Sequence, residues 1–146
     1  MKCELKNVKI ASNLSRETIA FAASLWIDGK KAADYHNDGN GGCNIGSFDD
    51  PKLGKQFHKW CESLPADKSK YGDLPMNEDL FISLLVEDYE NQRWVKSQTR
   101  TKIIFRLKGD GEGSWRTLKV SKGQDRGAAR KWIDDKYKGK VEVLHG

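Results

Sequence analysis

The sequence predicts an α+β fold with antiparallel sheets and about three helices, in the order β-β-β-α-α-β-β-α-β. Three observations lead to this prediction. Two runs of alternating apolar residues flank a two-residue turn at Asp28-Gly29, and two helical patterns occupy the middle of the chain. A second hairpin pattern then leads into a third helix and a last strand. We expect a single domain over 1–146, with 1–65 and 76–146 as an alternative subdivision.

Three strands are predicted in the first third of the chain. Val8 and Ile10 alternate with polar residues in the first strand. In the second, apolar side chains recur at every second position and share one face. These residues are Ile19, Phe21, Ala23, Leu25 and Ile27. Asp28-Gly29 tolerates the positive φ angles of a type I′ turn, so the chain is expected to return along a third strand through Tyr35.

Two helices are predicted next. Asp50-Pro51 is an N-cap followed by a proline at the first helical position, where its missing N–H costs nothing. The apolar residues after it recur on one helical face and end before Pro65. They are Leu53, Phe57, Trp60, Cys61 and Leu64. A polar linker at 66–75 precedes a second helix, which Asn77 is expected to cap and which should end near Ser97.

The buried stripe of this second helix is predicted to consist of Leu80, Phe81, Leu84, Leu85 and Tyr89, widened by Ile82 and Val86. The last part of the chain is predicted to form a strand at Thr101–Leu107, a hairpin loop at 108–113 and a return strand at Trp115–Val120. Asp125 is expected to cap a third helix with a common face. That face holds Ala128, Ala129, Trp132 and Ile133. Val141–Leu144 is the last predicted strand.

The composition limits the class of protein. The chain has 146 residues with 37% hydrophobic and 32% charged residues, and no apolar run is long enough to span a bilayer. The start of the chain lacks the apolar region of a signal peptide, so a cytoplasmic location is expected. Three cysteines at irregular spacing do not indicate a disulfide framework.

The charge is unevenly distributed. Residues 1–95 contain 12 Lys and Arg against 15 Asp and Glu, whereas residues 96–140 contain 14 against five. Basic residues with interleaved aromatics, here Trp94 and Trp115, are typical of surfaces that bind nucleic acid or an acidic protein. The predicted basic face consists of Arg100, Lys102, Arg106, Lys108, Arg116, Lys119, Arg126, Arg130 and Lys131. The alternative is that these residues form a solvent-exposed outer face of a sheet and have no binding role.

A glycine-rich loop follows the first hairpin, at residues 37–46. It lacks the lysine and hydroxyl ending of a P-loop, and its glycines do not fit a calcium loop. An ordered turn that needs positive φ at several residues is the favoured interpretation. The alternative is a binding loop whose contacts would come from Asn37, Asp38 and Asn40.

Metal binding and catalysis have weak support. His36, Cys43, His58 and Cys61 are candidate zinc ligands, but only His58 and Cys61 have a recognisable spacing, and Cys61 lies on the apolar helical stripe. No nucleophile elbow or carboxylate pair stands out. We therefore expect no metal, no cofactor and no enzymatic activity.

Three segments in the opening third of the chain form a recognisable pattern, namely Val8–Ala11, Phe21–Ala32 and Asn37–Gly42. They resemble the V-x-VDGKKAG hairpin and the following NDGHGG of a family of short, uncharacterised bacteriophage and prophage proteins. Asn40 stands where the family often has histidine, which weakens any metal or catalytic role for that loop position.

This resemblance implies a phage accessory protein in the cytoplasm of a bacterial host. We expect it to act by stoichiometric binding to a host protein or nucleoprotein complex, as an anti-CRISPR-like inhibitor of antiviral defence. The first alternative is a nucleic-acid-binding accessory protein that uses the basic last third. Simultaneous charge reversal at Lys102, Arg106 and Arg116 would test that alternative. The second is a protein that sequesters a nucleotide or another small ligand at the glycine loop.

Overall fold

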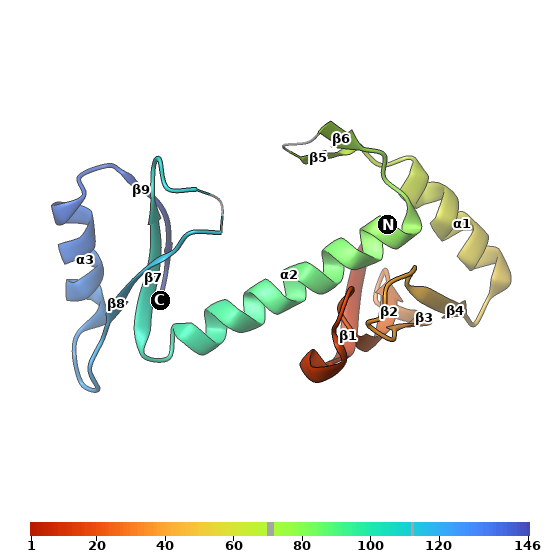
Figure 1. The fold of residues 1–146 in the computed structure, drawn as a ribbon, viewed down its shortest axis with the longest axis horizontal. Helices are drawn as coiled ribbons and strands as arrows, with labels where there is room; N and C mark the ends of the chain where they lie inside the picture. Colours follow the sequence, from red (N-terminus) through yellow and green to blue (C-terminus); the bar gives the residue numbers. More distant parts are fainter. Residues whose placement is uncertain (70–71, 112) are drawn as a thin grey trace. The chain divides into compact units, whose positions relative to one another are not determined.

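The computed structural model describes residues 1–69, 72–111 and 113–146. The chain forms two compact units, unit 1 (Met1–Asp88) and unit 2 (Tyr89–Gly146), whose elements are labelled in Figure 1. The α+β class and the order of the predicted elements are confirmed. The boundary between the units lies within helix α2 (Glu78–Gln98) and not in the predicted linker, because the first turns of α2 supply core residues to unit 1.

Unit 1 contains a four-stranded antiparallel sheet. Its strands lie in chain order, β1 (Cys3–Ile10), β2 (Phe21–Ile27), β3 (Lys30–Asn37) and β4 (Ile45–Phe48). A short 3-10 helix, η1 (Ser12–Leu14), lies between β1 and β2. Strand β4 is an addition to the predicted elements.

The β2–β3 hairpin has the predicted turn. Asp28 and Gly29 have φ angles of 51° and 84°, and Ile27 pairs with Lys30 across them. The alternate apolar residues of β2 are buried, as predicted, from Phe21 to Ile27. A β-bulge shifts the register between Leu25 and Trp26. Beyond it, the buried Ala23 and Leu25 pair with the buried Tyr35 and Ala33.

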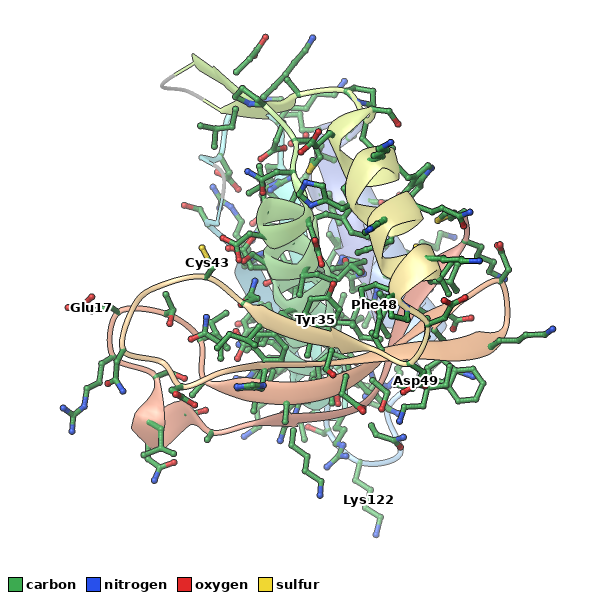
Figure 2. The ribbon with its side chains drawn as sticks, turned by 90° about the vertical axis from the view of Figure 1, so that its right-hand side faces the viewer. Glu17, Tyr35, Cys43, Phe48, Asp49 and Lys122 are labelled. Atoms are coloured by element: carbon green, nitrogen blue, oxygen red, sulfur yellow. The ribbon has the colours of Figure 1, made fainter. Side chains whose placement is uncertain are left out.

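Helix α1 (Pro51–Glu62) covers that apolar face together with the first turns of α2 (Figure 2). The Asp50 carboxylate accepts from the Lys52 N–H at 3.0 Å, which confirms the N-cap. Phe57 and Cys61 are the buried residues of α1. In Figure 2, Tyr35 and Phe48 lie between the sheet and the helices.

The buried residues of α2 differ from the predicted stripe. Ile82 and Val86 are buried completely or almost so, whereas Phe81 and Leu85 pack only partly against the core. The pattern alone did not reveal which part of a wide apolar surface would face the sheet. The region predicted as a linker also contains a small hairpin, β5 (Asp67–Ser69) and β6 (Gly72–Leu74), and the intervening residues 70 and 71 lie outside the described residues.

Unit 2 contains the last part of α2 and a three-stranded antiparallel sheet with one further helix packed on one face. The central strand β7 (Lys102–Leu107) pairs with β8 (Arg116–Lys119) and with β9 (Val141–His145). Helix α3 (Arg126–Lys136) begins at the predicted cap, where the carboxylate of Asp125 accepts from the Gly127 N–H at 2.9 Å. Of the predicted hairpin loop, residue 112 lies outside the described residues.

The core of unit 2 joins one face of the sheet to α3. Ile103, Phe105 and Leu107 of β7 pack there with Ala129 and Ile133 of α3. The predicted common face of α3 is therefore too wide. Ala128 and Trp132 are exposed, and Trp132 retains 49% of its accessible surface.

Candidate functional site

The glycine loop between β3 and β4 is built around Asn37. The side-chain oxygen of Asn37 accepts hydrogen bonds from the Thr18 hydroxyl at 2.7 Å and the Gly39 N–H at 2.8 Å. Its amide group donates to the Asn44 side-chain oxygen at 3.0 Å and the Gly42 carbonyl at 3.4 Å. Asn37 is buried, and these four bonds use both acceptor and both donor positions of its side chain. Asn37 therefore holds the loop and has no group left for a ligand.

Asn44 fastens the same loop to helix α2. Its backbone N–H donates to the Asp79 carboxylate at 2.7 Å, and its amide group donates to the Asp79 carbonyl at 3.1 Å and the Ser83 hydroxyl at 2.9 Å. Asp38 and Asn40, the other predicted contacts of the loop, are exposed and stand apart from the cavity beside it. These bonds favour an ordered structural turn.

Replacing Asn37 by alanine should lower the free energy of unfolding by about 1–3 kcal/mol, because it leaves the Gly39 N–H and the side-chain oxygen of Asn44 without their partners. Urea unfolding of the full chain measures this. Asn40→Ala, an exposed change in the same loop, should lie within about 0.5 kcal/mol of the parent. Equal stabilities for the two variants would contradict the structural role of Asn37.

A cavity of about 470 Å³ lies beside this loop in unit 1. Three carboxylates line it, those of Glu17, Asp79 and Glu87, against one guanidinium, that of Arg16. The negatively charged phosphates of a nucleotide are repelled by a lining in which carboxylates outnumber cations. The cavity therefore gives the nucleotide-sequestering alternative little electrostatic support.

The candidate zinc ligands are not brought together into a cluster. Cys61 is fully buried in the unit 1 core, where burial and the nearby Glu78 raise the pKa of its thiol to about 12. His36, Cys43 and His58 are exposed, and Figure 2 shows the Cys43 side chain pointing outward from its loop. Among residues 1–69, 72–111 and 113–146, no group of three or more His, Cys, Asp or Glu is arranged to hold a metal ion.

A hydrogen-bonded chain of side chains connects β3, α2 and α1. The hydroxyl of Tyr35 bonds to the Glu78 carboxylate, whose other oxygen lies 3.1 Å from Nδ1 of His58. The second ring nitrogen of His58 lies 2.8 Å from the Glu62 carboxylate. Burial, and then the bond to Glu78, raise the pKa of Tyr35. The bond to Glu78, followed by the charge of Glu62, raises the pKa of His58.

This hydrogen-bonded series of side chains is suited to stabilising the fold and not to proton abstraction. Both ring nitrogens of His58 face carboxylates, so the imidazolium satisfies both contacts, and an imidazolium is not a general base. Tyr35 is only 2% exposed, which leaves its hydroxyl without access to a substrate.

The contribution of His58 should depend on pH. Because its folded pKa is raised, its stabilising effect is fully present below the unfolded pKa of about 6.5 and is lost as the pH rises through the folded pKa. The stability difference between the parent and His58→Gln should therefore be larger at about pH 5.5 than at about pH 8.5. Urea midpoints measure it. Glu62→Gln should reduce this pH dependence, and a difference that grows with pH would contradict the assignment.

The predicted basic face is divided between the two sides of the unit 2 sheet. Lys102 pairs with Lys119 across β7 and β8, so both lie on the side away from α3, where Arg106 also lies. Arg116 pairs with Phe105 and lies over Tyr137, on the α3 side. The prediction that Arg116 joins the Lys102 and Arg106 face is therefore wrong, because Arg116 is paired with Phe105, whose side chain packs in the core with α3.

Several of the predicted basic residues have partners inside unit 2. Arg116 binds both oxygens of Asp110, at 3.0 and 3.2 Å, and this contact, then the Leu107 N–H, lowers the pKa of that carboxyl. Arg126 donates to the backbone carbonyl of Arg100 at 2.8 Å, and Arg106 lies 3.5 Å from Glu142. Lys102 is half-buried and donates to the side-chain oxygen of Gln98 at 3.2 Å. The exposed cations that remain from the predicted set are Arg100, Lys108, Lys119, Arg130 and Lys131.

A cavity of about 720 Å³ lies in unit 2, on the side of the sheet away from α3. Its walls come from the last turns of α2, from the β7–β8 hairpin and from β9. The rings of Trp94 and Trp115 lie 6.3 Å apart at an angle of 43°. The residues that line it are Asn91, Gln92, Trp94, Val95, Lys96, Thr99, Arg106, Gly113, Trp115 and His145.

Sequence reasoning noted Trp94, Trp115 and Arg106 but missed the cavity that they share. Asn91, Val95 and Thr99 recur at four-residue intervals on one face of α2, which was a usable signal for a second contact surface on this helix. His145 had no such signal, because only the pairing of Ile104 with His145 brings β9 to the cavity.

Comparison with protein-family models, curated proteins and solved structures found no match to this chain. Within the part of the chain that the structure describes, no helix has the length and apolar character needed to cross a membrane.

Proposed function

We propose that the protein is a non-enzymatic nucleic-acid-binding protein whose contact surface lies on unit 2. The observation that carries this proposal is the segregation of charge between the two units. Residues 89–146 hold 15 Lys and Arg against seven Asp and Glu, whereas residues 1–88 hold 11 against 14. A compact unit with a net charge of +8 is the electrostatic footprint of a protein that binds phosphates.

The side of the unit 2 sheet away from α3 is the favoured contact surface, and we call it the cavity face. It combines the exposed lysines Lys96 and Lys119 with the half-buried Lys102, whose ammonium group also donates to Gln98. The aromatic rings of Trp94 and Trp115 lie on the same face. Lysines neutralise phosphates whatever the base sequence, and aromatic rings stack on any base. The proposal is therefore binding without sequence preference.

Fluorescence anisotropy of labelled oligonucleotides tests the proposal. The full chain should bind a 20-nucleotide single strand, a duplex of the same length, or both, at about 50 mM salt, where phosphate contacts are strong. Protein that has been unfolded by heating and then cooled in urea serves as a control for non-specific adsorption. Failure to bind either oligonucleotide would overturn the proposal.

A second candidate is the stoichiometric binding of a host defence complex. It is supported by the resemblance of the β2–β3 hairpin and glycine loop to phage and prophage proteins, and it would use the same basic unit against an acidic or nucleic-acid-containing surface. Capture from nuclease-treated host lysate separates the candidates. A host protein retained after nuclease treatment, by a chain that binds no oligonucleotide, would favour this candidate over nucleic-acid binding.

A further inference from the structure

We infer that the cavity of unit 2 receives one unstacked nucleobase of a single-stranded nucleic acid, with Trp94 as its stacking platform. This inference rests on the proposed function and specifies the class of nucleic acid and the residue that contacts it. It follows from three features of the cavity, namely its aromatic geometry, its charge and the position of the lysines around it.

The first feature is the pair of tryptophan rings, of which Trp115 is held in place by neighbouring side chains and Trp94 is exposed to solvent. Trp115 is held by Arg106, whose guanidinium carbon lies 5.1 Å from the ring centroid, and by His145, whose ring lies at 5.7 Å. Trp94 contacts Trp115 at 6.3 Å, yet it remains 41% exposed. The angle of 43° between the two rings opens a wedge instead of a closed stack. A planar base can stack on Trp94 while Trp115 stays in place.

The second feature is the charge of the lining. Among the described residues that line this cavity, Lys96 and Arg106 carry positive charge and there is no carboxylate. Glu142, outside the lining, lies 3.5 Å from Arg106, so Lys96 is the cation of the lining without an acidic partner among the described residues. The cavity of unit 1 has the opposite character, with Glu17, Asp79 and Glu87 against Arg16. A base attached to a phosphate is attracted to the first lining and repelled by the second. The volume of about 720 Å³ lies within the range of about 300–1,000 Å³ typical of ligand sites.

The third feature is the set of cations outside the cavity. Lys102 and Lys119 are paired on the same side of the sheet, so a strand whose base enters the cavity has lysines for its flanking phosphates. Bases within a duplex are paired and stacked, and removing one costs a few kcal/mol. An unpaired strand presents its bases without that cost. The geometry therefore favours a single strand over a duplex. It also favours a single strand over a free nucleotide, because a free nucleotide would occupy the cavity without contacting the flanking lysines.

Trp94→Ala tests the inference. Loss of one base stack should weaken the binding of a 20-nucleotide oligothymidine by about 5- to 150-fold, and Trp94→Phe should retain most of the affinity. Trp132→Ala is the matched control, because Trp132 is the other exposed tryptophan of unit 2 and lies on α3. It should bind like the parent. Equal urea midpoints for the three variants would show that each is folded.

The competitors distinguish failure of this inference from failure of the proposed function. Unlabelled duplex and thymidine monophosphate should both displace the labelled strand more weakly than unlabelled single strand. If the chain binds single strand and duplex equally and Trp94→Ala changes nothing, nucleic-acid binding stands and the base-binding cavity is refuted. Displacement by the mononucleotide at the same concentration as the strand would refute the single-strand assignment. Absence of any binding would refute both.

Discussion

Phe57→Ala is expected to lower the free energy of unfolding by about 3–5 kcal/mol, the largest stability effect of any single change considered for this chain. Phe57 is fully buried at the centre of unit 1. Its ring lies 5.6 Å from Phe48 of β4, 6.0 Å from Trp60 of α1 and 5.9 Å from Phe81 of α2. Alanine removes one aromatic partner from three elements at once and leaves a cavity that they cannot fill.

Urea unfolding followed by far-UV circular dichroism measures the effect. Gln56→Ala, at the neighbouring exposed position of the same helix, controls for changes in helix propensity and should shift stability by no more than about 0.5 kcal/mol. A Phe57→Ala variant as stable as Gln56→Ala would contradict the packing of α1 and α2 on the sheet.

The second large effect is expected from charge reversal on the cavity face. Replacing Lys96, Lys102 and Lys119 by glutamate should reduce the affinity for single-stranded oligonucleotide roughly tenfold or more and should reduce the salt slope of binding by about 2, because three phosphate contacts are lost. Fluorescence anisotropy at several salt concentrations measures both quantities.

The structure provides a matched control for this variant. Arg130, Lys131 and Lys138 are exposed cations on α3 and the residues after it, so their reversal changes the net charge equally. Their effect should be much smaller, because charges beyond about 8–10 Å are largely screened at moderate salt. Equal losses for the two triple variants would place the contact surface elsewhere on unit 2.

The structure also changes which residues are suitable for such a test. Reversal at Arg106 and Arg116, which the sequence suggested together with Lys102, would break contacts within unit 2. Arg116 is bound to Asp110, and Arg106 stacks on Trp115 beside Glu142. Loss of binding in that variant would not separate a lost contact from a damaged fold.

Local signals in the sequence predicted much of the fold. The Asp28-Gly29 turn and the caps at Asp50 and Asp125 depend on residues only a few positions apart, and the structure confirms all three. Strand β4 was missed because its four residues include only two large apolar side chains, Ile45 and Phe48, and it is defined by pairing with β3.

The candidate site was harder to predict because it depends on contacts between distant segments. The alternation of apolar and charged residues correctly placed Lys102 and Arg106 on one side of β7, and it suggested that this side was exposed to solvent. Ile104 on the same side is completely buried. The side also carries the cavity, whose lining joins the last turns of α2 to β9. A helix whose two halves belong to different units cannot be recognised from its own periodicity.

The chain from Tyr35 through Glu78 and His58 to Glu62 illustrates the same limit. His58 and Glu62 are four residues apart on one helix, so their contact follows from helical geometry. The contact of Tyr35 with Glu78 joins residues 43 positions apart. Only the packing of β3 against α2 brings them together.

The salt dependence of oligonucleotide binding by the full chain tests the central claim most directly. Dissociation constants for a 20-nucleotide oligothymidine should rise steadily from about 50 to 200 mM salt. For three phosphate contacts, the logarithm of the association constant should fall against log salt with a slope of about −2 or steeper. Such a slope would support a basic nucleic-acid surface on unit 2. No measurable binding at the lowest salt, or an affinity independent of salt, would contradict it.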